Sequence, residues 1–304
     1  MQNQQKESTQ VFGALEAGGT KMVCAICGEN GEILERVSLP TRTPEETVPE
    51  MLAFFRNKGI RAIGIGCFGP IALDRSAPNY GSITTTPKLA WRDYPIVDAF
   101  AQALSVPVGF DTDVNAAALG EAAWGCTRDV RSSIYITIGT GVGVGVIADG
   151  KPYHGMMHPE GGHILLARRG DDPMPRGVCP YHESCLEGLA SGPAIEKRWG
   201  RRAQELADRP EVWELEAYYI GQAICDYILV LSPERVVLGG GVMHQPQLLP
   251  LIRREVERQL GGYIRTEKTA NLEQYIQGAS LHDNQGILGC LKLAMNALEG
   301  NDIQ

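Results

Sequence analysis

Short apolar runs joined by glycine turns open the chain and predict strands. Val11 to Ala17 and Lys21 to Cys27 are apolar segments on either side of Gly18-Gly19-Thr20. The Asn30-Gly31 pair that follows is a strong signal for a two-residue hairpin turn, and it leads into Ile33 to Ser38. We therefore expect three antiparallel strands at the start of the fold.

Helical and strand patterns alternate through the rest of the first half. Thr43 followed by Pro44, Glu45 and Glu46 is typical of a capped helix start, and apolar residues then recur at helical spacing. Four further segments predict a strand at Ile60–Gly66, a helix at Ile96–Leu104, a strand at Val106–Phe110 and an Ala-rich helix at Asp113–Trp124.

The second half repeats the opening pattern about 120 residues further along the chain. Ser133 to Ile138, the turn Gly139-Thr140-Gly141, Val142 to Ile147 and the turn Asp149-Gly150 have the same order as residues 11–38. Later segments predict helices at Leu215–Leu231, Gln247–Leu260 and Gln285–Leu298, and a strand at Arg235–Leu238. The duplication predicts two similar domains, at residues 1–117 and 118–284, with the last helix within 285–304 packed on the first.

Composition and charge exclude several classes of protein. The 304 residues include 28 basic and 36 acidic side chains, for a net charge of -8, which argues against a surface for nucleic acid or anionic membranes. No run approaches the roughly 18 apolar residues that a membrane helix needs, and the opening residues lack the apolar stretch of a secretory signal. We expect a cytoplasmic protein whose eight cysteines are packing residues or metal ligands.

Glycines gather in three clusters that suggest a site for nucleotide phosphate. Gly18-Gly19-Thr20-Lys21 and Gly139-Thr140-Gly141 occupy equivalent turns of the duplicated units, and Gly239-Gly240-Gly241 follows an apolar strand. Backbone N–H groups at such turns can approach an anion because no side chain intervenes. Each cluster alone could be a hairpin turn that needs positive φ. No P-loop motif or dinucleotide-binding glycine motif is present.

The chain resembles the ROK family of sugar kinases from Gly13 to Gly289. The resemblance is carried by Ile136 to Gly143 together with Glu160-Gly161-Gly162-His163. It implies an α/β fold of the actin/hexokinase type, with two ribonuclease H-like domains, mixed sheets flanked by helices and a cleft between the domains. It also implies Mg²⁺ with ATP and a homodimer. Glu16 stands where the family commonly has Asp, as in the fructokinase branch, and keeps a carboxylate that could orient Mg²⁺ or its waters.

The resemblance extends to the residues that would hold ATP. The candidate nucleotide and phosphate contacts are Gly18, Gly19, Thr20, Lys21, Gly139, Thr140, Gly141, Pro193, Gly239, Gly240 and Gly241.

A candidate general base lies where a strand meets a helix. A carboxylate there can accept the proton of a sugar hydroxyl as that hydroxyl attacks a γ-phosphoryl group. Asp113 matches the catalytic aspartate of the family's motif, whereas we interpret Asp111 as a helix cap. Thr112, where the family usually has Asn, and Asn115 are candidate substrate contacts.

Two histidines and two cysteines have the spacing of a metal site. His163, Cys179, His182 and Cys185 form a complete tetrahedral set with no open position, which predicts structural Zn²⁺. The alternative is a pair of buried thiols beside surface histidines. The resemblance also assigns Glu160, His163 and Glu187 to the sugar, so His163 could bind zinc through one ring nitrogen and sugar through the other. Cys24 and Cys27 have no partner pair nearby and are interpreted as packing residues.

The predicted function is ATP-dependent phosphorylation of the 6-hydroxyl of a hexose, most specifically of D-fructose to fructose 6-phosphate. Glucokinase, mannokinase and amino-sugar kinase are alternatives within the family. The family also includes sugar-sensing repressors, but here the first strand begins by residue 11 and the chain is acidic. A non-catalytic sugar-binding or scaffold protein is disfavoured because Lys21, Asp113 and all three glycine clusters are present.

Overall fold

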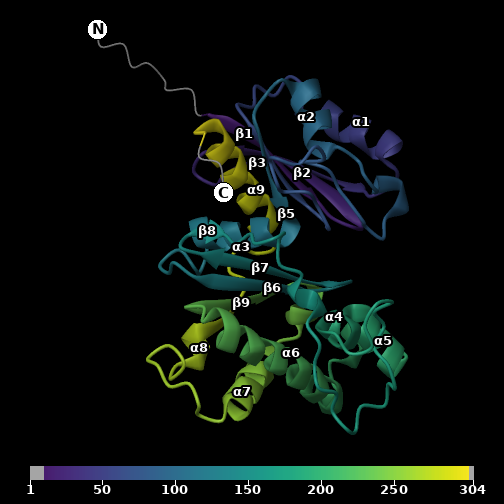
Figure 1. Cartoon of the computed structure of the whole chain (residues 1–304), viewed down its shortest axis with the longest axis vertical. Coiled ribbons are helices and arrows are strands. Elements are labelled where there is room, and N and C mark those ends of the chain that lie inside the picture. The colour runs from purple at the N-terminus through teal and green to yellow at the C-terminus, as the bar shows by residue number, and fades with distance from the viewer. Residues whose placement is uncertain (1–9, 301–304) are drawn as a thin grey trace. The chain divides into compact units, whose positions relative to one another are not determined.

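The protein is described here by a computed structural model that covers residues 10–300. The chain divides into two compact units. Unit 1 comprises the described residues up to Trp124, the short segment His154–His158 and the residues from Asn284 onward. Unit 2 comprises Gly125–Tyr153 and Pro159–Asp283. Figure 1 labels helices and strands of both units where there is room.

Unit 1 contains a five-stranded mixed sheet in the order β3-β2-β1-β4-β5. β1 pairs antiparallel with β2 and parallel with β4, so it is the central strand. Its strands are β1 (Val11–Ala17), β2 (Lys21–Gly28), β3 (Ile33–Pro40), β4 (Ile63–Cys67) and β5 (Val108–Thr112). The three antiparallel strands expected at the start of the chain are confirmed.

Helices cover both faces of this sheet. α1 (Pro44–Phe55) and α2 (Ile96–Leu104) pack on one face, and α3 (Asp113–Trp124) and α9 (Gln285–Leu298) pack on the other (Figure 1). α1 begins with the expected capping box, in which Thr43 and Glu46 bond each other's backbone. A short 3-10 helix, η1 (Leu89–Trp91), completes the ordered elements of this unit.

α3 and α9 pack so closely that glycine is required between them. A Cβ added at Gly289 of α9 would lie 1.6 Å from the carbonyl oxygen of Ala116 in α3. The domain boundary expected at residue 117 falls inside α3, whereas the whole of that helix belongs to unit 1. This close contact with α9 explains why the helix is not divided.

Unit 2 repeats the architecture of unit 1. Its five-stranded mixed sheet has the order β10-β9-β6-β7-β8, in which β6 pairs antiparallel with β7 and parallel with β9, as β1 does with β2 and β4. The predicted duplication is therefore present in the topology. The strands are β6 (Ser133–Ile138), β7 (Val142–Ala148), β8 (Lys151–Pro152), β9 (Arg235–Gly239) and β10 (Ile276–Gly278).

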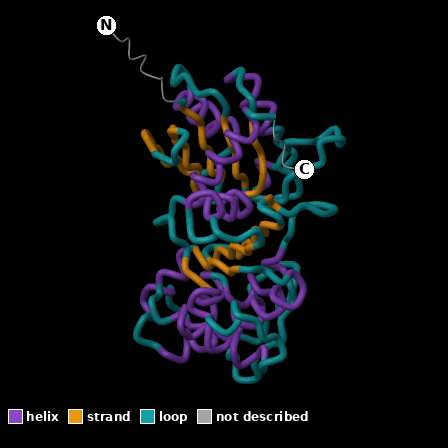
Figure 2. The backbone as a smooth tube through the Cα atoms, turned by 90° about the vertical axis from the view of Figure 1, so that its left-hand side faces the viewer, coloured by secondary structure: helices purple, strands orange, loops and turns teal. Residues whose placement is uncertain are grey.

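Buried apolar side chains from the sheet and the helices of unit 2 form one core. In Figure 2 the strands, in orange, lie together with helices, in purple, beside them. The helical segments are η2 (Gly161–His163), α4 (Leu186–Ala190), α5 (Gly192–Trp199), η3 (Ala203–Leu206), α6 (Pro210–Leu231), η4 (Gly241–His244), α7 (Leu248–Leu260) and α8 (Leu272–Tyr275). Across residues 10–300, no helix has the length and apolar character needed to cross a bilayer.

Candidate active site

The predicted base, Asp113, is the first residue of α3 and directly follows β5. One of its carboxylate oxygens, Oδ1, accepts a hydrogen bond from Val114 N at 2.9 Å. The helix is capped by the preceding residue, because Thr112 Oγ1 accepts from Asn115 N at 3.0 Å. Asp113 is only partly buried, so its carboxylate sits at a fixed strand-to-helix junction and retains an accessible surface.

The interpretation of Asp111 as a helix cap is wrong. Asp111 lies within β5 and is fully buried, and its Oδ1 accepts hydrogen bonds from Thr112 N at 2.7 Å and from Asn115 Nδ2 at 2.8 Å. Its Oδ2 lies 2.9 Å from His154 Nε2. Burial lowers the pKa of His154, but the hydrogen bond to Asp111 and the charge of Asp111 raise it by more, so the net pKa is raised.

The side chains of Thr112 and Asn115 are buried and form hydrogen bonds within the protein. Thr112 is 4% exposed and Asn115 is 0% exposed. Their hydrogen bonds hold the β5–α3 junction together, and their contact with a sugar stays a prediction.

Glu16, the candidate Mg²⁺ residue, lies in β1 beside the start of α9. A Cβ added at Gly286 would lie 2.6 Å from the Glu16 carboxyl carbon, so glycine makes room for this carboxylate. Burial raises the pKa of the Cys290 thiol well above its usual range, and the charges of Glu16 and Asp113 raise it further. The candidate metal residue and the candidate base therefore lie near the same buried thiol of unit 1.

The first glycine cluster forms the tight turn between β1 and β2. Gly18 N donates to Lys21 O at 3.0 Å, and Thr41 Oγ1 donates to Gly18 O at 2.7 Å. Among residues 10–300, the N–H groups of Gly19 and Thr20 form no hydrogen bond. The side chain of Lys88 passes alongside, since a Cβ added at Gly19 would lie 3.7 Å from Lys88 Cε. This turn offers backbone donors and amines, as an anion site requires.

The second and third glycine clusters lie at the ends of two neighbouring strands. β6 and β9 run parallel, and a Cβ added at Gly139 would lie 3.9 Å from Gly241 N. Gly192 N donates to Gly139 O at 2.7 Å, which brings the start of α5 and its Pro193 to the same place. The structure therefore brings the three predicted nucleotide segments of unit 2 together.

Two predicted sugar residues of unit 2, Glu160 and Glu187, interact electrostatically. Glu187 Oε2 accepts from Val142 N at 3.0 Å, directly after the second glycine cluster. Burial raises the pKa of Glu160, and the charge of Glu187 raises it further. Two carboxylates that interact in this way suit a ligand that carries several hydroxyl groups.

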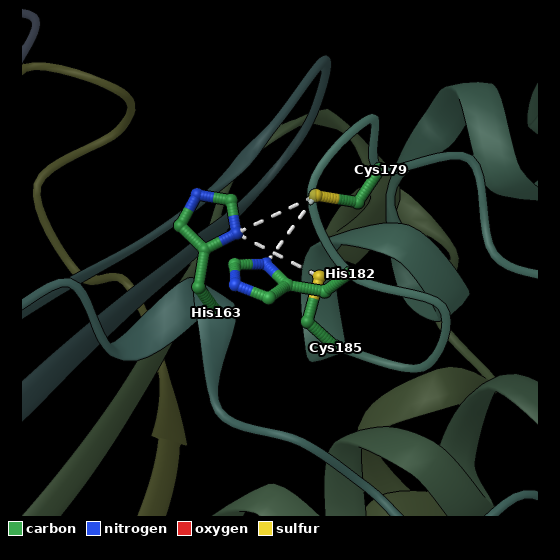
Figure 3. A group of neighbouring side chains, drawn as sticks. All are labelled: His163, Cys179, His182 and Cys185. Carbon is green, nitrogen blue, oxygen red and sulfur yellow. Dashed lines mark hydrogen bonds between the residues drawn. The ribbon is translucent and has the colours of Figure 1, made fainter. Parts of the chain in front are cut away.

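The four predicted metal ligands lie together in unit 2 (Figure 3). Their ligand atoms are all within 4.8 Å of one another. Cys179 Sγ lies 3.6 Å from His182 Nδ1 and 3.9 Å from His163 Nδ1, and Cys185 Sγ lies 3.6 Å from His163 Nδ1. Tetrahedral Zn²⁺ bonds to sulfur and nitrogen imply separations of about 3.5 Å. The arrangement fits zinc, and Gly188 N donates to Cys185 Sγ at 3.3 Å, as suits a thiolate.

The loop that carries these ligands has a second anchor that sequence reasoning missed. Asp172 and Arg198 form an ion pair at 2.9 Å with both side chains fully buried. Tyr219 Oη donates to Asp172 at 2.7 Å, and Arg198 Nη2 donates to Leu189 O at 2.8 Å. No local pattern indicates this anchor, because the partners of Asp172 are 26 and 47 residues away along the chain.

His154 is the second site residue that sequence reasoning missed. It is a lone histidine after the short strand β8 and has no motif spacing to Asp111, 43 residues earlier. Only the fold reveals this pairing.

Comparison with known proteins places this arrangement in a family. The sequence model described as ROK family matches residues 12–297. A fructokinase from Pediococcus pentosaceus is 44% identical over 289 residues, covering 95% of this chain and 99% of that protein. A fructokinase from Zymomonas mobilis is 40% identical over 300 residues, covering 96% of this chain and 99% of that protein.

A solved structure supports the same placement. It is a ROK family glucokinase from Streptomyces griseus in complex with glucose and AMPPNP, with a TM-score of 0.74 and 25% identity, covering 95% of this chain and 99% of that chain. The two mixed sheets flanked by helices agree with it. The chain belongs to the ROK family.

Proposed function

We propose that this protein is a fructokinase, which transfers the γ-phosphoryl group of ATP to the 6-hydroxyl of D-fructose. The observation that carries the proposal is the position of Asp113, a partly exposed carboxylate at the β5–α3 junction that, like Glu16, interacts with the buried thiol of Cys290. The full-length similarity to fructokinases supports fructose as the acceptor. The ROK glucokinase solved with AMPPNP supports ATP as the donor.

Asp113 acts as the general base. It accepts the proton of the fructose 6-hydroxyl while that oxygen forms a bond to the γ-phosphorus, and the bond from this phosphorus to the β–γ bridging oxygen breaks. ADP leaves with the bridging oxygen and its charge. Glu16 would hold Mg²⁺ or its waters, and the bound ion would supply charge neutralisation at the phosphates.

The glycine clusters bind the phosphates of ATP. The N–H groups of Gly19 and Thr20 supply donors in unit 1, and Lys21 adds a positive charge. In unit 2 the donors come from the adjoining turns at Gly139–Gly141 and Gly239–Gly241, next to Pro193.

The sugar hydroxyls are bound by Glu160, Glu187 and His163. Carboxylates accept hydrogen bonds from hydroxyl groups, and the second oxygen of Glu187 remains for this role after Val142 N occupies the first. His163 directs Nδ1 toward the thiol sulfurs, so Nε2 is the nitrogen left for the sugar.

Zinc would be held by His163, Cys179, His182 and Cys185 and would supply structural stabilisation rather than hydrolytic chemistry, since four protein ligands leave no open position. A metal bound at Nδ1 of His163 would fix the ring tautomer and leave Nε2 available to the sugar. We further propose that the protein acts as a cytoplasmic homodimer.

The product identifies the reaction. The purified protein is incubated with fructose, ATP and Mg²⁺, and the product is analysed by phosphorus NMR. The expected product is fructose 6-phosphate with one ADP for each phosphate transferred. Phosphate on another carbon, or ADP formed without sugar phosphate, would contradict the proposed reaction.

A further inference from the structure

Asp111 is a fully buried carboxylate that the proposed reaction does not use. A buried charge costs several kcal/mol unless donors surround it. Thr112 N and Asn115 Nδ2 donate to Oδ1 at 2.7 and 2.8 Å, and His154 Nε2 lies 2.9 Å from Oδ2. Both oxygens of Asp111 are therefore bonded, and one of the partners comes from a distant part of the chain.

The contact with Asp111 determines which ring nitrogen of His154 carries a hydrogen. A carboxylate offers only acceptors, so His154 must donate through Nε2. Asn115 Nδ2 lies 3.5 Å from the same ring nitrogen. Because Asn115 Nδ2 and His154 Nε2 both carry hydrogen, each donates to Asp111 and they do not bond to each other. His154 is 20% exposed, so solvent weakens this pair only in part.

His154 begins a short segment of unit 1, His154–His158, that we call the strap. The chain reaches the strap from β8 of unit 2 and returns to unit 2 at Pro159. At its other end, Ile71 N donates to His158 Nε2 at 3.2 Å, and His158 is 3% exposed. Two imidazoles thus fix the strap to unit 1: His154 bonds to the β5–α3 junction, and His158 bonds to Ile71, which follows β4.

We propose that His154 is a positioning residue for phosphoryl transfer, because its hydrogen bond to Asp111 fixes the β5–α3 junction from which Asp113 projects. Asp113 is two residues after Asp111, and Thr112 between them caps α3. A general base displaced by about 1 Å can lose up to ~100-fold in rate. The proposal rests on the proposed function of Asp113.

Two substitutions of His154 distinguish a role in positioning Asp113 from a role in folding. His154→Leu removes the donor to Asp111 and leaves a buried carboxylate underbonded. We expect kcat for fructose to fall by about 10- to 100-fold, while the KM values for fructose and ATP change by less than about 3-fold. His154→Gln places an amide nitrogen near the position of Nε2, so we expect it to restore kcat to within about 3-fold of the wild type.

A matched control comes from the strap itself. His158→Leu removes an imidazole that is more deeply buried than that of His154, and it leaves Ile71 N without its acceptor, so it lowers thermal stability. We expect its kcat per folded protein to stay within about 2-fold of the wild type. If His154→Leu does not fold, His154→Asn replaces it, because the shorter side chain stays polar but does not reach Asp111.

The possible outcomes distinguish failure of the positioning role from failure of the proposed function. Full kcat in His154→Leu, or equal losses in the Gln, Leu and His158→Leu variants, overturns the positioning role and leaves the fructokinase proposal intact. A wild-type protein inactive toward every hexose overturns the proposed function and the inference with it. Loss of kcat in His154→Leu with rescue by Gln supports the inference.

Discussion

Asp113 is the residue on which the proposed turnover depends most directly. Asp113→Asn keeps the size of the side chain and can still accept from Val114 N, but it cannot take the proton of the sugar hydroxyl. We expect kcat to fall by ~10² to 10⁴-fold, with KM values for fructose and ATP within a few-fold of the wild type. Steady-state kinetics measures both quantities.

A control for this substitution is Asp98→Asn, which changes an exposed carboxylate in the first turn of α2. We expect normal kinetics from it. Activity above about a tenth of wild type in Asp113→Asn would show that Asp113 is not the base.

Glu216 gives a second prediction at the scale of a residue. It is 1% exposed within α6, and its Oε1 has no hydrogen-bond partner in the described part of the chain. Burial raises its pKa well above the ordinary value of 4.5, opposed by the charge of Arg198. The folded state therefore binds a proton that the unfolded state releases as the pH rises, so this group favours folding less at higher pH.

Glu216→Gln removes the ionisable group, so unfolding of the variant no longer releases this proton. We expect the stability of the variant relative to the wild type to increase from about pH 4.5 upward, by up to about 1.4 kcal/mol per pH unit until the raised pKa is reached. Urea unfolding at pH 5, 6, 7 and 8 measures this difference. Parallel pH profiles for the two proteins would mean that Glu216 is ionised in the folded state.

At the scale of elements, local patterns determined most boundaries correctly. α2, α3 and α9 have the predicted ends, because apolar spacing and flanking residues agree there. β5 begins at Val108 instead of Val106, since Pro107 has no N–H to donate to the sheet. The pairs Asp111–His154 and Asp172–Arg198 were not predictable, because each joins residues that only the tertiary fold brings together.

In the third glycine cluster, a glycine that the backbone conformation requires can be tested separately from a glycine that is proposed to contact ATP. Gly240 has φ of 90°, and a Cβ there would lie 2.5 Å from Ile138 O. Gly241 has no atom within 4 Å of an added Cβ. We expect Gly240→Ala to lower stability by about 1–3 kcal/mol, whereas Gly241→Ala keeps stability and raises the KM for ATP. Equal stability of the two variants in thermal unfolding would contradict this.

The loop that carries the predicted zinc ligands Cys179, His182 and Cys185 also has a testable role. We expect about one zinc per chain by elemental analysis, and lower thermal stability and weaker fructose binding after chelation. His182→Ala should lose the metal without removing the His163 side chain itself, and His244→Ala, at an exposed histidine, should retain the metal. Freshly purified wild-type protein without zinc would refute the assignment.

At the scale of the whole molecule, duplication explains how the proposed chemistry is distributed. Each unit has the same strand order and a glycine turn after its first strand. Unit 1 carries Glu16 and Asp113, whereas unit 2 carries Glu160, His163 and Glu187. The repeat of turn and strand patterns was visible in the sequence. The choice of sugar was not, because hydroxyl recognition depends on the positions of side chains rather than on their spacing.

The central claim is therefore tested most directly by sugar preference. ADP release by the wild-type protein is followed in a coupled assay with fructose, glucose, mannose and N-acetylmannosamine at equal concentrations, and kcat/KM is determined for each. The account predicts that fructose gives the highest kcat/KM. Fastest ADP release with glucose, and none with fructose, would contradict it.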